Sequence, residues 1–251
     1  MLTEERQNAI LRELKEKGAV TVTGLSAELG ISESTVRRDL QGLAAVGKLH
    51  KVHGGATALE VQNFASDEDD VPTKATKNIS EKERIAKYAA GLIDDSDFVF
   101  LDAGTTTEKM IDYLDSKLKA SFVTNGIVHA KKLISKGLRA YIIGGQLKLS
   151  TEAVIGAVAV NNLKQYNFTK SFMGANGITV SQGFTTPDTE EGLLKAEAVN
   201  RSYMSYVLAD HSKFNRVFSV TFAPVEKACI ITDSLPNPEF RKHTVVKEVE
   251  A

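Results

Sequence analysis

The 251-residue sequence predicts a small, mostly helical N-terminal domain followed by a larger α/β domain. Two observations support this prediction. Apolar residues recur at helical spacing through residues 3–46, whereas from Ser80 onward short, continuous apolar runs alternate with amphipathic helical segments. A chain of this length accommodates a small domain together with a medium-sized one.

Three helices are expected in the N-terminal domain. Gly18 ends the first of them. The second is short and covers residues 24–29, and Gly30-Ile31-Ser32 forms a turn of the length that joins the two helices of a helix-turn-helix. The third begins near Glu33, with Ser32 as its N-cap, and extends to about Val46.

A strand and a turn follow the third helix. Residues 48–53 alternate polar and apolar side chains, and Gly54-Gly55 turns the chain back. Leu49 and Val52 are expected to form the apolar face of this strand. Three polar residues are expected off that face, namely Lys48, His50 and His53. Three short helices followed by a small hairpin make up the winged form of the helix-turn-helix.

The third helix has a polar outer face. Val36, Leu40 and Leu43 recur at helical spacing and are expected to face the core. This phase leaves hydroxyl, guanidinium and amide groups outside, which are the groups that bind the phosphates and base edges of DNA. The candidate DNA-binding residues of the helix and strand are Ser32, Ser34, Thr35, Arg37, Arg38, Gln41, Lys48, His50, Lys51 and His53. The alternative is an ordinary solvated surface helix.

The charge around this helix is locally positive. Residues 37–53 contain four Lys or Arg residues and one acidic residue, Asp39, a local net charge of +3, against −1 for the whole chain. A local basic face is sufficient for nucleic-acid binding. Asp39 is expected to pair with an arginine inside the domain, because phosphates would repel a carboxylate facing them. No Cys, Asp or Glu near His50 and His53 completes a metal ligand set, so no metal site is expected.

The composition excludes several classes of protein. The single cysteine, Cys229, excludes an intrachain disulfide and a cysteine-rich zinc site, and it suits a reducing cytoplasm. No segment approaches the roughly 20 apolar residues of a membrane span. The first residues alternate charged and apolar side chains, so no signal peptide is predicted. We therefore expect a cytoplasmic protein with no membrane partner and no cofactor.

A linker is expected between the two domains. The sequence pattern places the N-terminal domain at residues 1–57, the linker at 58–77 and the larger domain at 78–251. The linker contains an acidic run, Ser66 to Asp70, which is expected to be a solvated loop. The alternative is that this run contacts the basic wing when DNA is absent.

The larger domain alternates predicted strands and helices, which is typical of an α/β domain with a mostly parallel sheet. The strand-like segments are residues 98–101, 121–124, 140–143, 171–173, 206–209 and 229–232. The helical segments begin at Ser80 and continue at residues 107–114, 128–135 and 189–202.

Polar and glycine-rich turns follow several of these strands. Ligands of such folds bind beyond the carboxyl ends of the strands. After the first strand, Gly104 permits close backbone approach, the threonines offer hydroxyls, and the helix behind them offers free N–H groups, which together suit a phosphate. The candidate effector-binding residues are Asp102, Gly104, Thr105, Thr106, Thr124, Asn125, Gly144, Gly145, Gly174, Asn176, Gly177 and Lys213. Each of these turns by itself is also compatible with an ordinary connection.

The N-terminal domain resembles the DeoR family of bacterial sugar-responsive transcription regulators. The resemblance runs without a gap from Arg6 to Ala56. It lies in Arg6, Ile10, Leu14, Gly18, Val20, Val22, Leu25, Ala27, Leu29, Ser32, Thr35-Val36-Arg37-Arg38-Asp39-Leu40, Leu43, Gly47, Leu49 and Val52-His53-Gly54-Gly55-Ala56. It implies that Ser34, Thr35, Arg37 and Arg38 enter the major groove of DNA.

The larger domain also resembles this family, whose sensor domain is similar to ribose-5-phosphate isomerase. The matching motifs are D-x-G-T-T-T at 102–107, T-N at 124–125, G-G at 144–145, G-x-x-G at 174–177 and D-x-x-K-F at 210–214. The resemblance implies a sugar-phosphate effector, whose phosphate is held by Gly104, Thr105 and Thr106. It further implies that Asp102 and Asn125 bond the sugar hydroxyls and that Lys213 supplies positive charge.

The function expected from this resemblance is repression of a sugar-utilisation operon, with release from the operator by a phosphorylated sugar. Residues 1–6 and the R-R-D-L segment look closest to fructose phosphotransferase operon repressors of Gram-positive bacteria, which favours fructose 1-phosphate as the effector. The expected partners are double-stranded operator DNA and further copies of the chain, in a homodimer or homotetramer, because helix-turn-helix proteins match half-sites by symmetry.

The alternative function is a sugar-phosphate isomerase-like enzyme with an accessory DNA-binding domain. Such an enzyme needs a carboxylate base and a cation near the enediolate, and five residues of suitable type are Glu190, Glu191, Glu197, Lys195 and Lys213. The isomerases, however, carry an aspartate-rich turn where this chain has Gly174-Ala175-Asn176-Gly177. No catalytic residue is therefore assigned. The three carboxylates are expected to be surface charge on the helix or acceptors of hydrogen bonds from sugar hydroxyls. An RNA-binding N-terminal domain lacks the aromatic residues that would stack on bases.

Overall fold

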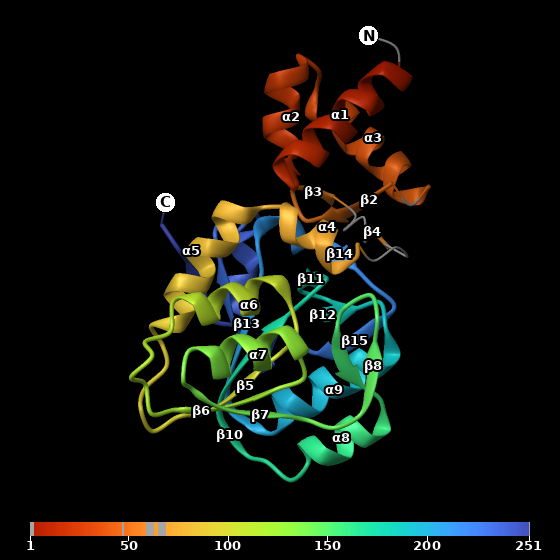
Figure 1. Ribbon diagram of the computed structural model, residues 1–251. Helices are drawn as coiled ribbons and strands as arrows, with labels where there is room; N and C mark the ends of the chain where they lie inside the picture. Colours follow the sequence, from red (N-terminus) through yellow and green to blue (C-terminus); the bar gives the residue numbers. More distant parts are fainter. Residues whose placement is uncertain (1–2, 47, 59–62, 65–68, 251) are drawn as a thin grey trace. The chain divides into compact units, whose positions relative to one another are not determined.

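The computed structural model describes residues 3–46, 48–58, 63–64 and 69–250. The chain forms two compact units, Met1–Val61 and Gln62–Ala251 (Figure 1). The boundary falls inside the expected linker, so that residues from Gln62 onward belong to the larger unit.

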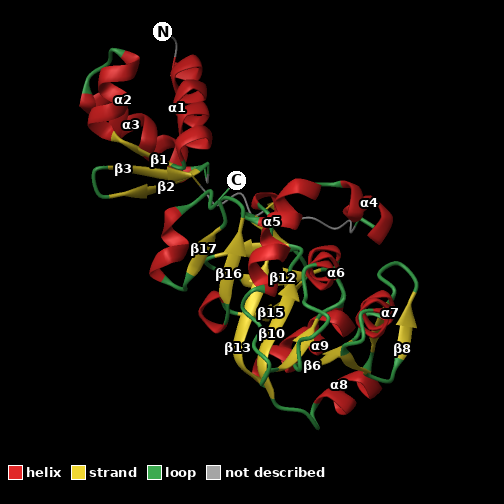
Figure 2. Ribbon diagram, turned by 60° about the vertical axis from the view of Figure 1, so that its left-hand side comes forward, coloured by secondary structure: helices red, strands yellow, loops and turns green. Residues whose placement is uncertain are grey.

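The smaller unit is a three-helix domain with a three-stranded antiparallel sheet (Figure 2). Its elements are α1 (Thr3–Lys17), β1 (Ala19–Thr21), α2 (Val22–Leu29), α3 (Glu33–Ala45), β2 (Leu49–Val52) and β3 (Gly55–Ala58), with the strand order β1-β3-β2. Its core is formed by ten buried residues, Ile10, Leu14, Val20, Val22, Leu25, Val36, Leu40, Leu43, Leu49 and Ala56. The predicted helix-turn-helix with a wing is confirmed.

Local sequence features explain the turns of this unit. Gly30 ends α2 in the left-handed conformation, with φ of 64°, and Ser32 caps α3 by accepting a hydrogen bond from the backbone N–H of Thr35 at 3.3 Å. Gly55 has no room for a side chain, because a Cβ atom there would lie 2.1 Å from the carbonyl oxygen of Val20. The absence of a Cβ at Gly55 therefore lets β1 pair closely with β3.

The expected apolar face of the β2 strand is wrong in one residue. Leu49 is buried, with 2% of its surface exposed, but Val52 is 46% exposed. Side chains alternate along a strand, so two residues three apart point to opposite faces. Val52 therefore shares its face with the exposed His50.

The larger unit is built on a seven-stranded sheet in which all neighbouring strands are parallel. The strands are β5 (Phe98–Leu101), β6 (Ser121–Thr124), β7 (Arg139–Ile142), β10 (Phe168–Gly174), β13 (Ser202–Leu208), β16 (Cys229–Thr232) and β17 (Val246–Glu248), in the order β17-β16-β13-β10-β5-β6-β7. The helices are α5 (Ile79–Ala90), α6 (Thr105–Asp112), α7 (Ile127–Ser135), α8 (Ala157–Leu163) and α9 (Thr189–Asn200). The predicted α/β domain with a mostly parallel sheet is confirmed.

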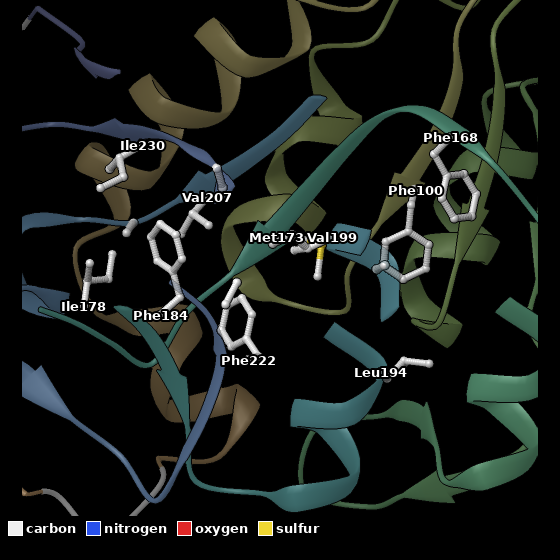
Figure 3. Close-up of a cluster of buried hydrophobic side chains, with 14 of the residues drawn as sticks. Phe100, Phe168, Met173, Ile178, Phe184, Leu194, Val199, Val207, Phe222 and Ile230 are labelled. Carbon is white, nitrogen blue, oxygen red and sulfur yellow. The ribbon is translucent and has the colours of Figure 1, made fainter. Parts of the chain in front are cut away.

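Each face of the sheet carries its own core. Val99 and Leu101 of β5 pack with residues of α5 and α6, whereas Phe100 between them packs with residues of α8 and α9. Figure 3 shows part of the second core, where Phe100 lies beside Phe168 and Phe184 lies beside Phe222. Strands buried on both faces explain why the sequence shows continuous apolar runs in place of alternation.

Smaller elements surround the sheet. An antiparallel sheet consists of β11 (Gly177–Thr179), β12 (Gly183–Thr186) and β15 (Val220–Ala223), and β8 (Gln146–Lys148) pairs with β9 (Ala153–Ile155). β4 (Asn63–Phe64) runs parallel to β14 (Arg216–Val217). Three short 3-10 helices are η1 (His211–Lys213), η2 (Val225–Lys227) and η3 (Pro238–Lys242).

The expected linker contains a helix, α4 (Val71–Thr76). Asp70 caps it by accepting a hydrogen bond from the backbone N–H of Thr73 at 2.9 Å, and Pro72 occupies its first turn, where a missing N–H costs nothing. Asp69 forms a salt bridge with Lys77 at 2.8 Å. Two members of the acidic run thus have partners within the larger unit, and the other three, Ser66 to Glu68, lie outside the described residues.

The strand order contains a switch point. The chain moves from β5 to β6 and β7 on one side, and later places β10 on the other side of β5. In open α/β sheets a crevice forms at such a point, beyond the carboxyl ends of the strands. The segments after β5 and β10 therefore flank the expected ligand position.

Within the described residues, none of the helices combines the length and the apolar character needed to cross a lipid bilayer.

Candidate functional site

The outer face of α3 carries the polar groups expected from its sequence. Ser34, Arg37, Arg38 and Gln41 are exposed and Thr35 is half-buried. Arg37 forms a salt bridge with Glu33 one turn earlier, with 2.6 Å between Nη2 and Oε2. Within the described residues, Arg38 has neither an ion pair nor a side-chain hydrogen bond, so its guanidinium is available to a ligand.

Asp39 faces the interior of the smaller unit. It is buried, and its two carboxylate oxygens accept hydrogen bonds from Nε and Nη2 of Arg6, the second at 2.9 Å. This bidentate salt bridge raises the pKa of the Arg6 guanidinium and links α1 to α3. The prediction that Asp39 pairs with an arginine inside the domain is confirmed.

The N-terminus of α3 is surrounded by hydroxyl groups. Oγ of Ser32 lies 3.0 Å from Oγ of Ser34 and 2.8 Å from Oγ1 of Thr35. A helix N-terminus with unpaired N–H groups attracts phosphate. The remaining candidates of this unit are all exposed. Lys48 directly precedes β2, His50 and Lys51 lie on it, and His53 lies in the turn after it.

A pocket opens beside the carboxyl ends of β5 and β10 in the larger unit. Its lining consists of Val71, Lys74, Lys82, Ala103, Gly104, Thr105, Thr106, Thr107, Thr151, Gly174, Ala175, Asn176, Glu191, Lys195, Leu208, Asp210 and Lys213. These residues come from α4, α5, the start of α6, the β8–β9 turn, α9 and the segments after β10 and β13. The pocket therefore lies at the switch point of the sheet.

One part of the pocket is cationic. Lys82 is 3% exposed, and burial lowers its pKa to about 8. Its ammonium group donates a hydrogen bond to the backbone carbonyl of Lys74. Burial also lowers the pKa of Lys213. A buried ammonium group is stabilised by an anion close to it, because burial has removed the water that would solvate its charge.

The N-terminus of α6 adds backbone donors to the pocket. Its first residues, Thr105 and Thr106, line the pocket, and no side chain caps the helix at Gly104. Thr107 stabilises the loop between β5 and α6. Its hydroxyl donates to the carbonyl of Asp102 at 2.6 Å and lies 3.1 Å from Nε2 of His129. Burial lowers the pKa of His129 to about 4, so this imidazole is neutral near pH 7 and does not compete for an anion.

A buried ion pair joins the two strand ends behind the pocket. Oδ2 of Asp102, directly after β5, accepts hydrogen bonds from Nζ of Lys195 and from the backbone N–H of Gly174, the latter at 2.9 Å. Lys195 also donates to the carbonyl of Gly174 at 3.2 Å. Oδ1 of Asn125 accepts from the backbone N–H of Ala103 at 2.8 Å. These contacts fix the positions of the loops that carry the pocket-lining groups.

The structure divides the twelve candidate effector-binding residues into two groups. Six line the pocket, namely Gly104, Thr105, Thr106, Gly174, Asn176 and Lys213. The other six lie outside its lining, namely Asp102, Thr124, Asn125, Gly144, Gly145 and Gly177.

The residues of the second group make contacts within the protein, and their expected ligand contacts stay predictions. Asp102 and Asn125 are buried and bonded as described, so both support the loops. Their expected contact with sugar hydroxyls stays a prediction. Thr124 accepts from the backbone N–H of Gly126 at 3.0 Å. A Cβ at Gly145 would lie 2.8 Å from the carbonyl oxygen of Ile155, and one at Gly177 2.3 Å from that of Arg216. Gly144, exposed after β7, donates its N–H to Asn162 at 3.3 Å.

Several pocket residues were not predicted as effector-binding residues. Lys74 lies in the segment expected to be a linker, and Thr151 lies in a turn without a motif. Lys82 has a recognisable signal, because it occupies the same helical phase as the buried Ile85, Ala86 and Ala89. A lysine on the apolar stripe of a helix is rarely buried without a ligand or partner.

Glu191, Lys195 and Asp210 also line the pocket without having been assigned to effector binding. Asp210 is bonded by Nδ2 of Asn78 at 2.8 Å and by the N–H of Ser212 at 3.0 Å. Among the described residues, no group of three His, Cys, Asp or Glu side chains is placed to hold a metal ion, and this includes His50 and His53.

Both units match families of known proteins. Residues 6–62 match the family model described as "DeoR-like helix-turn-helix domain", and residues 77–234 match the one described as "DeoR C terminal sensor domain". The two matches together span most of the chain.

Individual proteins are similar over the whole length. The chain is 41% identical over 253 residues to the uncharacterized HTH-type transcriptional regulator FruR of Bacillus subtilis, and the match covers 100% of both chains. It is 32% identical over 234 residues to the lactose phosphotransferase system repressor of Staphylococcus epidermidis, covering 92% of each. Among solved structures, ribose 5-phosphate isomerase A of Methanocaldococcus jannaschii matches with 16% identity over 55% of each chain and a TM-score of 0.42.

Proposed function

The chain belongs to the DeoR family of helix-turn-helix transcriptional regulators, and on this premise we propose that it represses a sugar-utilisation operon and leaves its operator when a phosphorylated sugar binds. We propose fructose 1-phosphate as the first candidate for that sugar. Membership of this family makes the chain a regulator of transcription and not an enzyme.

The cations of the pocket, one buried and one half-buried, are the observation that carries the proposed effector class. Lys82 and Lys213 line the pocket, and neither forms a salt bridge within the described residues. Thr105 and Thr106 add the N–H groups of a helix N-terminus. This combination suits a phosphate monoester, which brings about two negative charges and three acceptor oxygens at pH 7.

The relatives support the sugar part of the proposal. The lactose phosphotransferase system repressor is named for a system that handles a sugar, and it is similar to this chain over nearly its whole length. Fructose 1-phosphate is favoured because residues 1–6 and the R-R-D-L segment at 37–40 look like those of fructose-operon repressors.

Operator binding is assigned to α3 and the wing. The exposed Arg38 and the hydroxyl-rich N-terminus of α3 supply contacts to base edges and phosphates, and Lys48 and Lys51 add phosphate contacts from the wing. A helix-turn-helix protein of this kind matches two half-sites by symmetry, so we propose that it acts as a homodimer or homotetramer.

Release requires a difference in affinity between two states. The effector must bind the DNA-free arrangement more tightly than the DNA-bound one, because equal affinity shifts no equilibrium. Moving the protein from 1% to 99% DNA-free needs roughly 5.5 kcal/mol, which several subunits can share.

Operator release is the test of this proposal. The full-length protein is bound to DNA from upstream of its neighbouring sugar genes at a fixed salt concentration, because phosphate contacts make the affinity salt-dependent. Fructose 1-phosphate, fructose 6-phosphate, glucose 6-phosphate and unphosphorylated fructose are then titrated separately. We expect release by one phosphorylated sugar at millimolar concentration or below, and none by fructose.

The other outcomes separate the parts of the proposal. If the protein binds the DNA specifically but no sugar phosphate releases it, the proposed operator binding would stand and the proposed effector class would be refuted. Release by glucose 6-phosphate or fructose 6-phosphate but not by fructose 1-phosphate would retain the class and replace the favoured sugar.

A further inference from the structure

The effector pocket has a second chemical character besides its cations. Lys74, Lys82 and Lys213 come from α4, α5 and η1, whereas Glu191 and Thr151 come from α9 and the β8–β9 turn. Figures 1 and 2 both draw α4 and α5 apart from α9 and β8. Glu191 is a carboxylate paired with Lys148 at 3.0 Å, and an acceptor of this kind suits a hydroxyl donor better than an anion.

Glu191 is held firmly in this part of the pocket. It is 7% exposed, and its backbone N–H donates to Oδ1 of Asp188, the N-cap of α9, at 2.9 Å. Its Oε1 accepts from Nζ of Lys148 at 3.0 Å and from the hydroxyl of Thr151 at 2.9 Å. Its Oε2 lies 3.4 Å from the hydroxyl of Thr186, whose single proton is shared with Oδ1 of Asn176 at 3.2 Å. The carboxylate is therefore preorganised from three separate elements.

The hydrogen bonds leave Glu191 with acceptor capacity. An ionised carboxylate has about four lone-pair sites, and within the described residues two full donors and one shared hydroxyl occupy it. Because Glu191 also lines the pocket, a further donor can reach it only from a ligand or water there. Sugar hydroxyls are donors, whereas a phosphate dianion is not.

From this arrangement we propose that Glu191 determines effector specificity by accepting a hydrogen bond from a hydroxyl of the sugar. This inference rests on the proposed function, since it assumes that the pocket binds a phosphorylated sugar. The lysines bind the phosphate that all such effectors share, and Glu191 distinguishes a hydroxylated ligand from a bare anion. A site built to bond a hydroxyl rejects ligands that lack it, because its polar group is then left unpaired.

The test compares ligand affinities by calorimetry on the full-length protein, with fructose 1-phosphate, fructose 6-phosphate, glucose 6-phosphate and inorganic phosphate as the probes. Glu191→Gln keeps the shape of the side chain and removes its charge. We expect the affinity for the best sugar phosphate to fall roughly 10- to 100-fold, the range of a hydrogen bond to a charged group. The affinity for inorganic phosphate is expected to stay the same or rise.

Glu190→Gln is the matched control, because it makes the same charge change at the neighbouring, exposed residue. We expect it to leave both affinities within about threefold of wild type. Operator binding without effector checks that each variant is folded. If Glu191→Gln fails to fold, Thr151→Val removes one hydroxyl that orients the carboxylate and is expected to lower sugar-phosphate affinity selectively, by roughly three- to tenfold.

Three results would overturn the inference. Equal losses for sugar phosphate and inorganic phosphate in Glu191→Gln would make Glu191 a general structural residue. If Glu191→Gln has the same ratio of sugar-phosphate to inorganic-phosphate affinity as the wild type, Glu191 does not recognise the sugar, and the proposed function is unaffected. Binding of inorganic phosphate but of no sugar phosphate by the wild-type protein would refute the proposed function together with the inference.

Discussion

Two adjacent arginines on α3, Arg37 and Arg38, differ in their interactions with the rest of the protein. Arg37 is paired with Glu33 at 2.6 Å, whereas Arg38 has no partner within the described residues. Binding DNA through Arg37 requires that its salt bridge be shared or broken, although an exposed pair of this kind contributes only about 0.3–0.5 kcal/mol. Binding DNA through Arg38 would break no existing contact of this kind.

Arg38→Ala is therefore expected to weaken operator binding by about 1–3 kcal/mol, or roughly 5- to 150-fold, as for an arginine that contacts a guanine. The measurement is a titration of operator DNA at one salt concentration. Arg12→Ala, which removes an exposed arginine from α1, is the control for charge. An operator affinity in Arg38→Ala equal to that of the Arg12→Ala variant would exclude Arg38 from base recognition.

The lowered pKa of Lys82 predicts how effector binding depends on pH. Burial holds this pKa near 8, below the ordinary value of 10.5, so the free protein loses the charge as pH rises above 8. A sugar phosphate stays dianionic there, because its second pKa is near 6. Its affinity is therefore expected to fall about tenfold between pH 7 and pH 9. Folding has the opposite dependence, since the unfolded chain binds more protons between pH 8 and 10.5 and the free energy of unfolding rises across that window.

Lys82→Arg provides the control for this pH dependence. Its guanidinium stays charged throughout the range, so we expect the affinity to change less with pH than in the wild type. Calorimetry at three pH values measures both profiles. Parallel profiles in the two proteins would show that another group causes the decline.

The sequence predicts part of the pocket at the level of residues. Gly104, Thr105 and Thr106 were predictable because a glycine and threonines between a strand and a helix form a local motif. Lys74 and Thr151 were not assigned, because their place in the lining depends on how α4 and the β8–β9 turn pack against distant loops. Asn125 and Gly177 also lie in polar or glycine-rich turns after strands, as Gly104 does, but they do not line the pocket. Asn125 accepts a hydrogen bond from Ala103, and Gly177 packs against the backbone of Arg216.

At the scale of elements, the wing depends on two glycines with different tasks. Gly54 has φ of 80°, and open space surrounds it, so a substitution there strains only the backbone. Gly55 has no positive φ, but a Cβ would collide with the carbonyl of Val20 at 2.1 Å. The first position limits conformation and the second limits the approach of β1 to β3.

The two alanine variants are therefore expected to differ. Gly54→Ala should lower the free energy of unfolding by about 1–2 kcal/mol, the cost of a left-handed residue with a Cβ. Gly55→Ala should destabilise the smaller unit by more than Gly54→Ala, because β1 must separate from β3. Urea unfolding of the full-length protein, followed by the loss of operator binding, measures both. Equal effects would show that the sheet adjusts to the extra carbon.

Elements were predicted well where the sequence pattern is local and repeated. Continuous apolar runs predicted the inner parallel strands correctly, because burial on both faces requires them. The helix α4 was missed because Asp70 and Pro72 are typical of loops, although both also start helices. The apolar face of β2 was wrong at Val52 because residues three apart cannot share a face of a strand.

At the scale of the whole molecule, the chain enters the larger unit through residues that contact the pocket. β4 pairs with β14, the backbone N–H of Val71 donates to Ser150 at 3.3 Å, and Nδ2 of Asn78 donates to Asp210 at 2.8 Å. Val71 and Asp210 themselves line the pocket. A ligand that moves these groups therefore moves the segment that continues, along the chain, into the DNA-binding unit. On the proposed function, we expect these contacts to connect effector binding to operator release.

Asn78 offers a way to weaken this connection without blocking the pocket. It has φ of 50°, a conformation that glycine adopts without strain, so Asn78→Gly removes the side-chain bonds to Asp210 and Ser212 and keeps the backbone. We expect effector affinity to change less than about threefold. We also expect the coupling between effector and operator to weaken by about 0.5–2 kcal/mol, so that more effector is needed for the same release. Asn215→Gly is the matched control, because Asn215 has φ of 57°. Normal release by Asn78→Gly at wild-type effector concentrations would show that the signal leaves the pocket by another path.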